Sequence, residues 1–215
     1  MAETVPAPAP VVEPYATTAQ QHEAATLGMW IFLATEILFF GALFTAYAVY
    51  RHWFGQGFAA AGSHTDIMLG SINTAVLLTS SAVMALAVES AKAGAWRGAT
   101  ALLGVTALLG LVFLAIKISE WHSEYTEHLL PGAHFSPDLQ SIPGTSLFFT
   151  LYFAMTGVHA LHLLIGIIFT TTLAIRCKRG NIRPALVEMG GLYWHFIDVV
   201  WIFLFPLLYL NGRAG

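Results

Sequence analysis

Long apolar stretches alternate with short polar connections along this chain. Each stretch is long enough to cross a membrane, since about 20 residues at a rise of 1.5 Å span the hydrocarbon core. In lipid every backbone polar group must be satisfied within its own segment, so helices are the expected form. The pattern predicts one all-α membrane domain over residues 25–215, a bundle of five transmembrane helices at about residues 26–53, 66–91, 96–127, 145–176 and 185–211.

The segments between the apolar stretches contain glycine and proline, which interrupt helices. Residues 1–24 differ from the rest, because they hold four of the nine prolines, three glutamates and no lysine or arginine. A secretory signal needs a basic start and a small-residue cleavage site after its apolar core, and neither is present. We interpret residues 1–24 as a flexible cytoplasmic tail.

The basic residues indicate how the helices are oriented in the membrane. The tail, the second-to-third connection and the fourth-to-fifth connection share one side and hold six of them, whereas the opposite side holds Arg51 and Arg213. Lys117, near the end of the third span, is left out of both counts. The positive-inside rule therefore predicts a cytoplasmic N-terminus and a C-terminus on the outer side. An acidic group falls on the outer side and is interpreted as solvated surface, with a basic partner as the alternative: Glu120, Glu124, Glu127 and Asp138.

Composition supports the membrane assignment and excludes several functions. The chain is 57% hydrophobic and 10% charged, whereas globular chains carry about 25% charged residues. The single cysteine, Cys177, excludes an internal disulfide and a multi-cysteine metal site. Nine scattered lysines and arginines are too few for nucleic-acid binding. The chain shows no clear internal repeat, which counts against a small transporter.

Ionisable residues occur deep inside three of the predicted spans. Glu36 lies roughly 15 Å along the first span. A charge at such depth is costly and marks a pathway, a ligand site or an internal partner. Two pairs are spaced by three residues and so share a helix face, His159 with His162 and His195 with Asp198.

Three interpretations compete for these deep residues. A di-iron site in a helix bundle needs Glu-x-x-His motifs, which the spans lack, but heme b held by His159 or His162 together with His195 stays open. A proton relay through Glu36 would need a chain of groups to both surfaces, so a neutral glutamate donating a hydrogen bond is favoured. The preferred interpretation is mutual hydrogen bonding, because pairing lowers the cost of burial.

A basic group adjoins the inner ends of the fourth and fifth spans. Such a cluster can bind anionic lipid head groups, although the topology rule alone would also produce it. The candidates for head-group binding are Arg176, Lys178 and Arg183.

Several segments resemble subunit III of heme-copper terminal oxidases, in the bacterial five-helix form. The first two spans carry LGMWIFLATEILFFGALFTAYAVYR and LGSINTAVLLTSSAVMALA, and SEWHSEYTE follows the third. The fourth and fifth carry GTSLFFTLYFAMTGVHALHLLIGIIF and GLYWHFIDVVWIFLFPLLYLNG. The resemblance covers about residues 27–212 in the same order, and GVHALH together with YWHFIDVVW is highly specific.

The resemblance implies an accessory subunit of cytochrome c oxidase that itself has no catalytic site and binds no cofactor. Heme and copper would belong to partner subunits, with subunit I as the main contact and subunit II in the same complex. It also implies that the first two helices and the last three enclose a lipid-filled cleft, and that the subunit supports proton uptake during oxygen reduction. The residues implied to hold the bundle and line the cleft are Glu36, His159, His162, His195 and Asp198.

The residues agree with an accessory role. A catalytic subunit needs histidine ligands on several spans for its hemes and copper, whereas only three histidines lie deep here, and a binuclear copper site needs a second cysteine beside Cys177. Quinol-oxidase versions often carry aspartate where Glu36 stands, so the cytochrome c branch in a bacterial inner membrane is favoured. The alternatives are a quinol-oxidase subunit III, a homologue associated with nitric oxide reductase, and an independent b-type membrane cytochrome.

Overall fold

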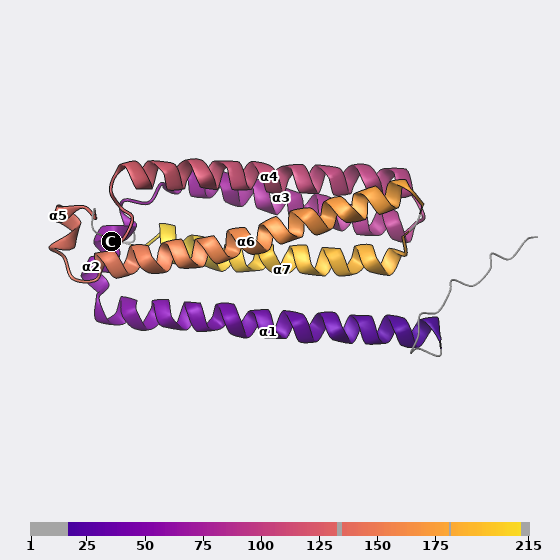
Figure 1. Ribbon diagram of the computed structural model, residues 1–215, viewed down its shortest axis with the longest axis horizontal. Coiled ribbons are helices and arrows are strands. Elements are labelled where there is room, and N and C mark those ends of the chain that lie inside the picture. Colours follow the sequence, from indigo (N-terminus) through magenta and orange to yellow (C-terminus); the bar gives the residue numbers. More distant parts are fainter. Residues whose placement is uncertain (1–16, 133–134, 181, 212–215) are drawn as a thin grey trace, which may run out of the picture. The chain divides into compact units, whose positions relative to one another are not determined.

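The computed structural model describes residues 17–132, 135–180 and 182–211, and these fold into helices without strands. Two short helices, α2 (Gly55–Gly62) and α5 (Pro137–Gln140), lie at one end of the bundle (Figure 1). The long helices are α1 (Thr18–Trp53), α3 (Ile67–Lys92), α4 (Trp96–Thr126), α6 (Thr145–Lys178) and α7 (Pro184–Tyr209).

The five long helices are long and apolar enough to cross a membrane, which confirms the predicted fold class. Their bounds lie close to the predicted ones except in α1, which begins at Thr18. Residues 18–24, assigned to the tail by the sequence analysis, are therefore helical, whereas residues 1–16 of that predicted tail lie outside the described residues. The helix α2 forms in a predicted connection because GQGFAAAG contains an alanine run with high helix propensity.

Local sequence signals fix several helix ends. The Asp66 carboxylate caps α3, accepting hydrogen bonds from the backbone nitrogens of Met68 at 2.9 Å and Leu69 at 3.1 Å. Helix α7 starts with Pro184, whose missing N–H costs nothing in the first turn. The turn from α3 to α4 contains Gly94 with φ +72°, a left-handed conformation that glycine adopts without strain.

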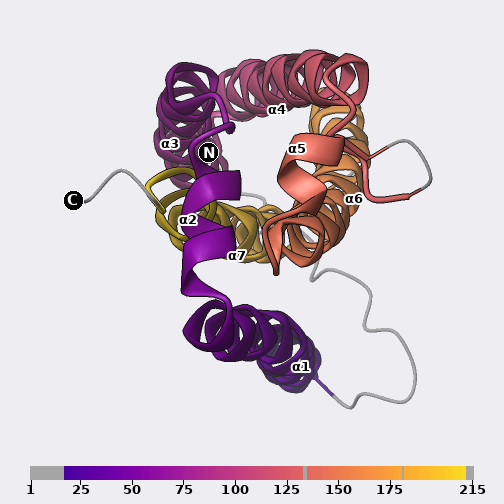
Figure 2. The same ribbon diagram turned by 90° about the vertical axis from the view of Figure 1, so that its left-hand side faces the viewer.

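The chain divides into two units between Leu38 and Phe39. In the second unit α3 packs along α4 and α7, and α6 packs along the same two helices, as the end-on view shows (Figure 2). The predicted grouping of two helices against three is not seen, because α3 packs against helices that the prediction assigned to the other group. A three-residue connection after α3 makes α4 its antiparallel neighbour.

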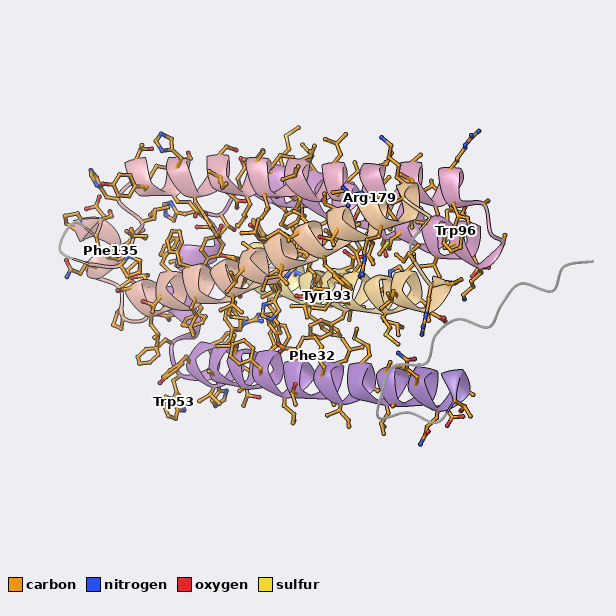
Figure 3. All side chains as sticks on the ribbon, turned by 45° about the vertical axis from the view of Figure 1, so that its right-hand side comes forward. Phe32, Trp53, Trp96, Phe135, Arg179 and Tyr193 are labelled. Carbon is orange, nitrogen blue, oxygen red and sulfur yellow. The ribbon has the colours of Figure 1, made fainter. Side chains whose placement is uncertain are left out.

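The two ends of the second unit are named here for residues that mark them. Figure 3 shows Phe135 and Trp53 at one end, where α2 and α5 also lie, and Trp96 and Arg179 at the other. We call them the α5 end and the Trp96 end.

Gly110 marks a close approach of three helices. A Cβ atom there would lie 2.9 Å from Ile167 Cγ1 of α6 and 2.9 Å from Trp194 Cη2 of α7. Small residues allow such contacts between membrane helices, where packing is a main source of association. Gly104, also on α4, would place its Cβ in open space.

Replacing Gly110 with valine is expected to lower the free energy of unfolding in detergent by about 1–3 kcal/mol, because the Trp194 ring cannot move aside without repacking. The matched control is Gly104→Val, which changes helix propensity equally but places its Cβ in open space. Equal unfolding free energies for the two variants would contradict the close packing at Gly110.

Candidate functional site

A closed polar network lies inside the bundle near the α5 end. Lys117 Nζ donates to Glu120 Oε2 at 3.1 Å and to the hydroxyls of Tyr152 at 2.7 Å and Tyr209 at 2.5 Å. Both hydroxyls donate in turn to Glu120 Oε1, at 2.9 Å and 2.7 Å. We call these four side chains the Lys117 network; it links α4, α6 and α7.

The network meets the cost of burying an ion pair. All four side chains are buried, so the Lys117 ammonium loses its hydration and all three of its donors have to find acceptors. Two tyrosine rings add favourable electrostatic contact, because Nζ lies 4.5 Å from the Tyr152 ring centroid and 5.2 Å from that of Tyr209. The arrangement is a fully satisfied clamp between helices.

Glu124 lies one turn beyond Glu120 and is also buried. Neither of its carboxylate oxygens, nor Trp121 Nε1, has a hydrogen-bond partner among the described residues. The assignment of Glu120 and Glu124 to a solvated outer surface is therefore wrong. The predicted helix at about 96–127 already contained both glutamates, as α4 does, and the spacing of Lys117, Glu120 and Glu124 places them on one inward face.

The two histidines of α6 have different surroundings. His159 is buried, with its ring centroid 5.7 Å from that of Phe113 and 5.1 Å from that of Trp201, and its ring nitrogens have no hydrogen-bond partner in the described part of the chain. His162 Nδ1 lies 2.9 Å from the backbone oxygen of Val158, and its ring packs against Phe40 of α1. His159 thus packs against Phe113 and Trp201, and His162 against Phe40.

His195 pairs across helices rather than with its predicted neighbour. Its Nδ1 forms a hydrogen bond of 2.8 Å with Ser81 Oγ on α3, whereas Asp198 Oδ2 lies 3.9 Å away, which is too far for a hydrogen bond. The Asp198 carboxylate is buried, and its oxygens have no hydrogen-bond partner within the described ranges. The two side chains are thus close, as their spacing predicted, but Ser81 is the partner that the sequence did not reveal.

The remaining predicted residues belong to other segments of the chain. Glu36 is half-buried on α1, in the unit that precedes the boundary at Leu38. Arg176 and Lys178 are exposed in the last turn of α6, and Arg183 precedes α7, so this basic group lies at the Trp96 end. Among the described residues no three histidine, cysteine, aspartate or glutamate side chains are grouped as a metal site would require.

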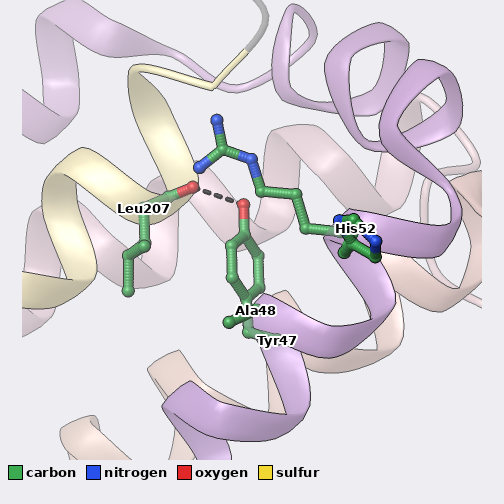
Figure 4. A pocket seen from close by; sticks show the side chains of 5 residues that line it. Tyr47, Ala48, His52 and Leu207 are labelled. Carbon is green, nitrogen blue, oxygen red and sulfur yellow. Dashed lines mark hydrogen bonds between the residues drawn. The ribbon is translucent and has the colours of Figure 1, made fainter.

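A pocket of about 450 Å³ lies at the α5 end (Figure 4). The Tyr47 hydroxyl donates to the backbone oxygen of Leu207 at 2.5 Å and accepts from Asn211 Nδ2 at 3.2 Å. Leu207 belongs to the last turn of α7, where carbonyl groups lack a partner within the helix. Tyr47 therefore stabilises the end of α7 from α1. The pocket is lined by Tyr47, Ala48, Arg51, His52 and Leu207.

Replacing Lys117 with methionine is expected to lower the free energy of unfolding by about 3–5 kcal/mol, because Glu120 is then left as an unpaired buried charge. The double variant Lys117→Met/Glu120→Gln should recover part of this loss. A double-mutant cycle, measured by unfolding in detergent, gives the coupling between the two residues. Additive effects of the two single changes would contradict the clamp.

Comparison with known proteins identifies the family. Residues 14–213 match the family described as cytochrome c oxidase subunit III. Quinol oxidase subunit 3 of Bacillus subtilis is 33% identical over 192 residues, covering 88% of both chains. Cytochrome c oxidase subunit 3 of Alkalihalophilus pseudofirmus is 32% identical over 195 residues, covering 88% of this chain and 87% of the relative.

A third relative joins two subunits in one polypeptide. The heme-copper oxidase subunit I+III of Aeropyrum pernix is 31% identical over 192 residues, which are 85% of this chain and 22% of the relative. The resemblance drawn from the motifs is confirmed, and the chain belongs to the subunit III family of heme-copper oxidases.

Proposed function

We propose that this chain is the accessory, non-catalytic subunit III of a bacterial respiratory heme-copper oxidase. In this role it stabilises the catalytic subunit, binds phospholipid and supports proton uptake during oxygen reduction. The observation that carries the proposal is the family match, which extends over residues 14–213 and so includes all five long helices from end to end.

Subunit I is proposed as the main partner, with subunit II in the same complex. The relative from Aeropyrum pernix is named as a fusion of subunits I and III. Two subunits that occur as one polypeptide in a relative are expected to be neighbours when they are separate chains.

Heme and copper are proposed to belong to the partner subunits. The deep histidines have protein neighbours that account for their positions: aromatic rings for His159, a backbone carbonyl for His162 and Ser81 for His195. These contacts favour internal packing as the role of His159 and hydrogen bonding as the role of His162 and His195.

The electron donor divides the proposal in two. Glu36 favours a cytochrome c oxidase, because quinol-oxidase versions of the family often carry aspartate there. A quinol oxidase is the second candidate, since relatives of similar identity are named as quinol oxidase subunits.

The orientation and lipid contacts follow from the basic residues. Arg176, Lys178 and Arg183 adjoin the ends of α6 and α7 at the Trp96 end. The positive-inside rule places this end, with the N-terminus, on the cytoplasmic side of the inner membrane and the C-terminus on the outer side. Head groups of anionic phospholipids in the inner leaflet are the proposed ligands of the cluster.

Purification of the tagged chain from its native membrane tests the proposed function. The chain should copurify with heme-containing subunit I and with subunit II, and the complex should oxidise reduced cytochrome c faster than a quinol. After the subunits are separated, the visible spectrum of this chain should contain no heme band. A Soret band that stays with the isolated chain would instead favour an independent b-type cytochrome.

The triple substitution Arg176→Gln/Lys178→Gln/Arg183→Gln is expected to reduce the amount of anionic phospholipid that copurifies with the complex, because the head groups lose their cationic partners. Arg97→Gln, an exposed change on α4 at the same end, is the control. Phospholipid analysis by mass spectrometry measures the effect, and unchanged retention in the triple variant would contradict lipid binding at this cluster.

A further inference from the structure

His195 exposes a polar ring in the middle of a membrane-spanning helix. Its side chain is 40% exposed, and it lies about 17 Å along α7 from Pro184 at 1.5 Å per residue. An imidazole facing hydrocarbon at this depth is costly, and such residues normally face protein or a polar cavity. Because the bond to Ser81 uses only Nδ1, no hydrogen bond of Nε2 is formed within the described residues.

His195 belongs to a continuous outward stripe on α7. Val199 and Ile202 follow at spacings of four and three residues, and their side chains are 49% and 46% exposed. We call His195, Val199 and Ile202 the His195 stripe; at these spacings they lie on one face of the helix.

Contacts on both sides limit the stripe. On one side the buried Phe196 packs against Phe40 of α1, with ring centroids 6.0 Å apart, and Phe203, 57% exposed, lies 6.2 Å from Phe44. On the other side Trp201 Nε1 donates to Thr74 Oγ1 of α3 at 3.0 Å. The stripe is therefore the part of α7 between its α1-facing and α3-facing sides.

Exposed positions on α4 and α6 include many aliphatic side chains. Aliphatic side chains match lipid chains, whereas a half-exposed imidazole does not. The exposed aliphatic residues are Leu108, Leu111, Val112 and Ile118 on α4 and Leu161, Leu164, Ile165 and Ile168 on α6.

Ser81 engages one ring nitrogen of His195, with its Oγ 2.8 Å from Nδ1. Nε2 is therefore the ring nitrogen through which His195 can bind a partner. A matching partner presents a polar group that can form a hydrogen bond at the middle of the membrane, surrounded by apolar side chains.

We propose that the His195 stripe is the docking surface for a transmembrane helix of the catalytic subunit I. That helix forms a hydrogen bond with His195 Nε2 and packs its apolar side chains on Val199 and Ile202. This inference rests on the proposed function, which makes subunit I the main partner, and the fused subunit I+III relative supports that choice of occupant.

Site-specific photo-crosslinking in the assembled oxidase tests the stripe. The photoreactive residue p-benzoylphenylalanine replaces Val199 or Ile202, and the matched controls carry it at Leu111 or Ile118 on the aliphatic face of α4. We expect adducts with subunit I from the two stripe positions and none from the two controls.

The remaining outcomes contradict the inference in different ways. Adducts with subunit I from α4 alone would overturn the stripe as the interface while leaving the proposed function intact. Adducts from the stripe with another copy of this chain or with an unrelated protein, or no adducts at all, would also overturn it. If subunit I does not copurify with the tagged chain, the proposed function itself fails.

A second measurement separates the partner contact from internal stability. His195→Leu should increase the dissociation of this subunit from the detergent-solubilised oxidase about three- to tenfold, the range expected for one interhelical hydrogen bond. Ser81→Ala removes the internal bond but keeps the imidazole at the surface, so its dissociation should stay near wild type. Equal dissociation of the two variants would overturn a role for His195 at the interface.

Discussion

A charged lysine side chain inside a membrane bundle can be tolerated only if each of its donors meets an acceptor. Lys117 satisfies this condition through Glu120, Tyr152 and Tyr209, and the two hydroxyls return their own protons to the same carboxylate. Because the four side chains come from α4, α6 and α7, the condition also fixes how these helices are aligned at the α5 end. Tyr47 of α1 also holds the end of α7, because its hydroxyl donates a hydrogen bond to the Leu207 carbonyl.

Side-chain hydrogen bonds also connect α3 to α7 along their length. Trp201 donates to Thr74, Trp194 donates to Ser80 at 3.1 Å, and His195 pairs with Ser81. Between membrane helices the hydrophobic effect contributes little, so hydrogen bonds and close packing at small residues such as Gly110 have to supply specificity. The result is a bundle whose interior polar groups hold helices in place, which agrees with the proposed role of supporting a neighbouring catalytic chain.

Much of the fold could be predicted from the sequence, because hydrophobic length is a strong signal for a membrane helix. The family could also be recognised, since the motifs around His159 and His195 are specific. The partner of His195 could not be predicted, because spacing within one helix does not show which helix lies opposite. Glu120 and Glu124 were assigned to solvated surface because they lie at the outer end of the predicted helix, although their spacing from Lys117 already placed the three on one face. The grouping of two helices against three came from the resemblance alone, and the packing of α3 on α4 and α7 differs from it.

The central proposal is that the deep imidazole groups of this chain contact protein neighbours and serve assembly, while the redox centres belong to other chains. A high-resolution cryo-electron microscopy map of the purified oxidase tests it most directly. The account predicts continuous density for the Lys117 network, with the rings of His159 and His195 contacting only protein or water. Density for a porphyrin or a coordinated metal ion between α6 and α7 would contradict it.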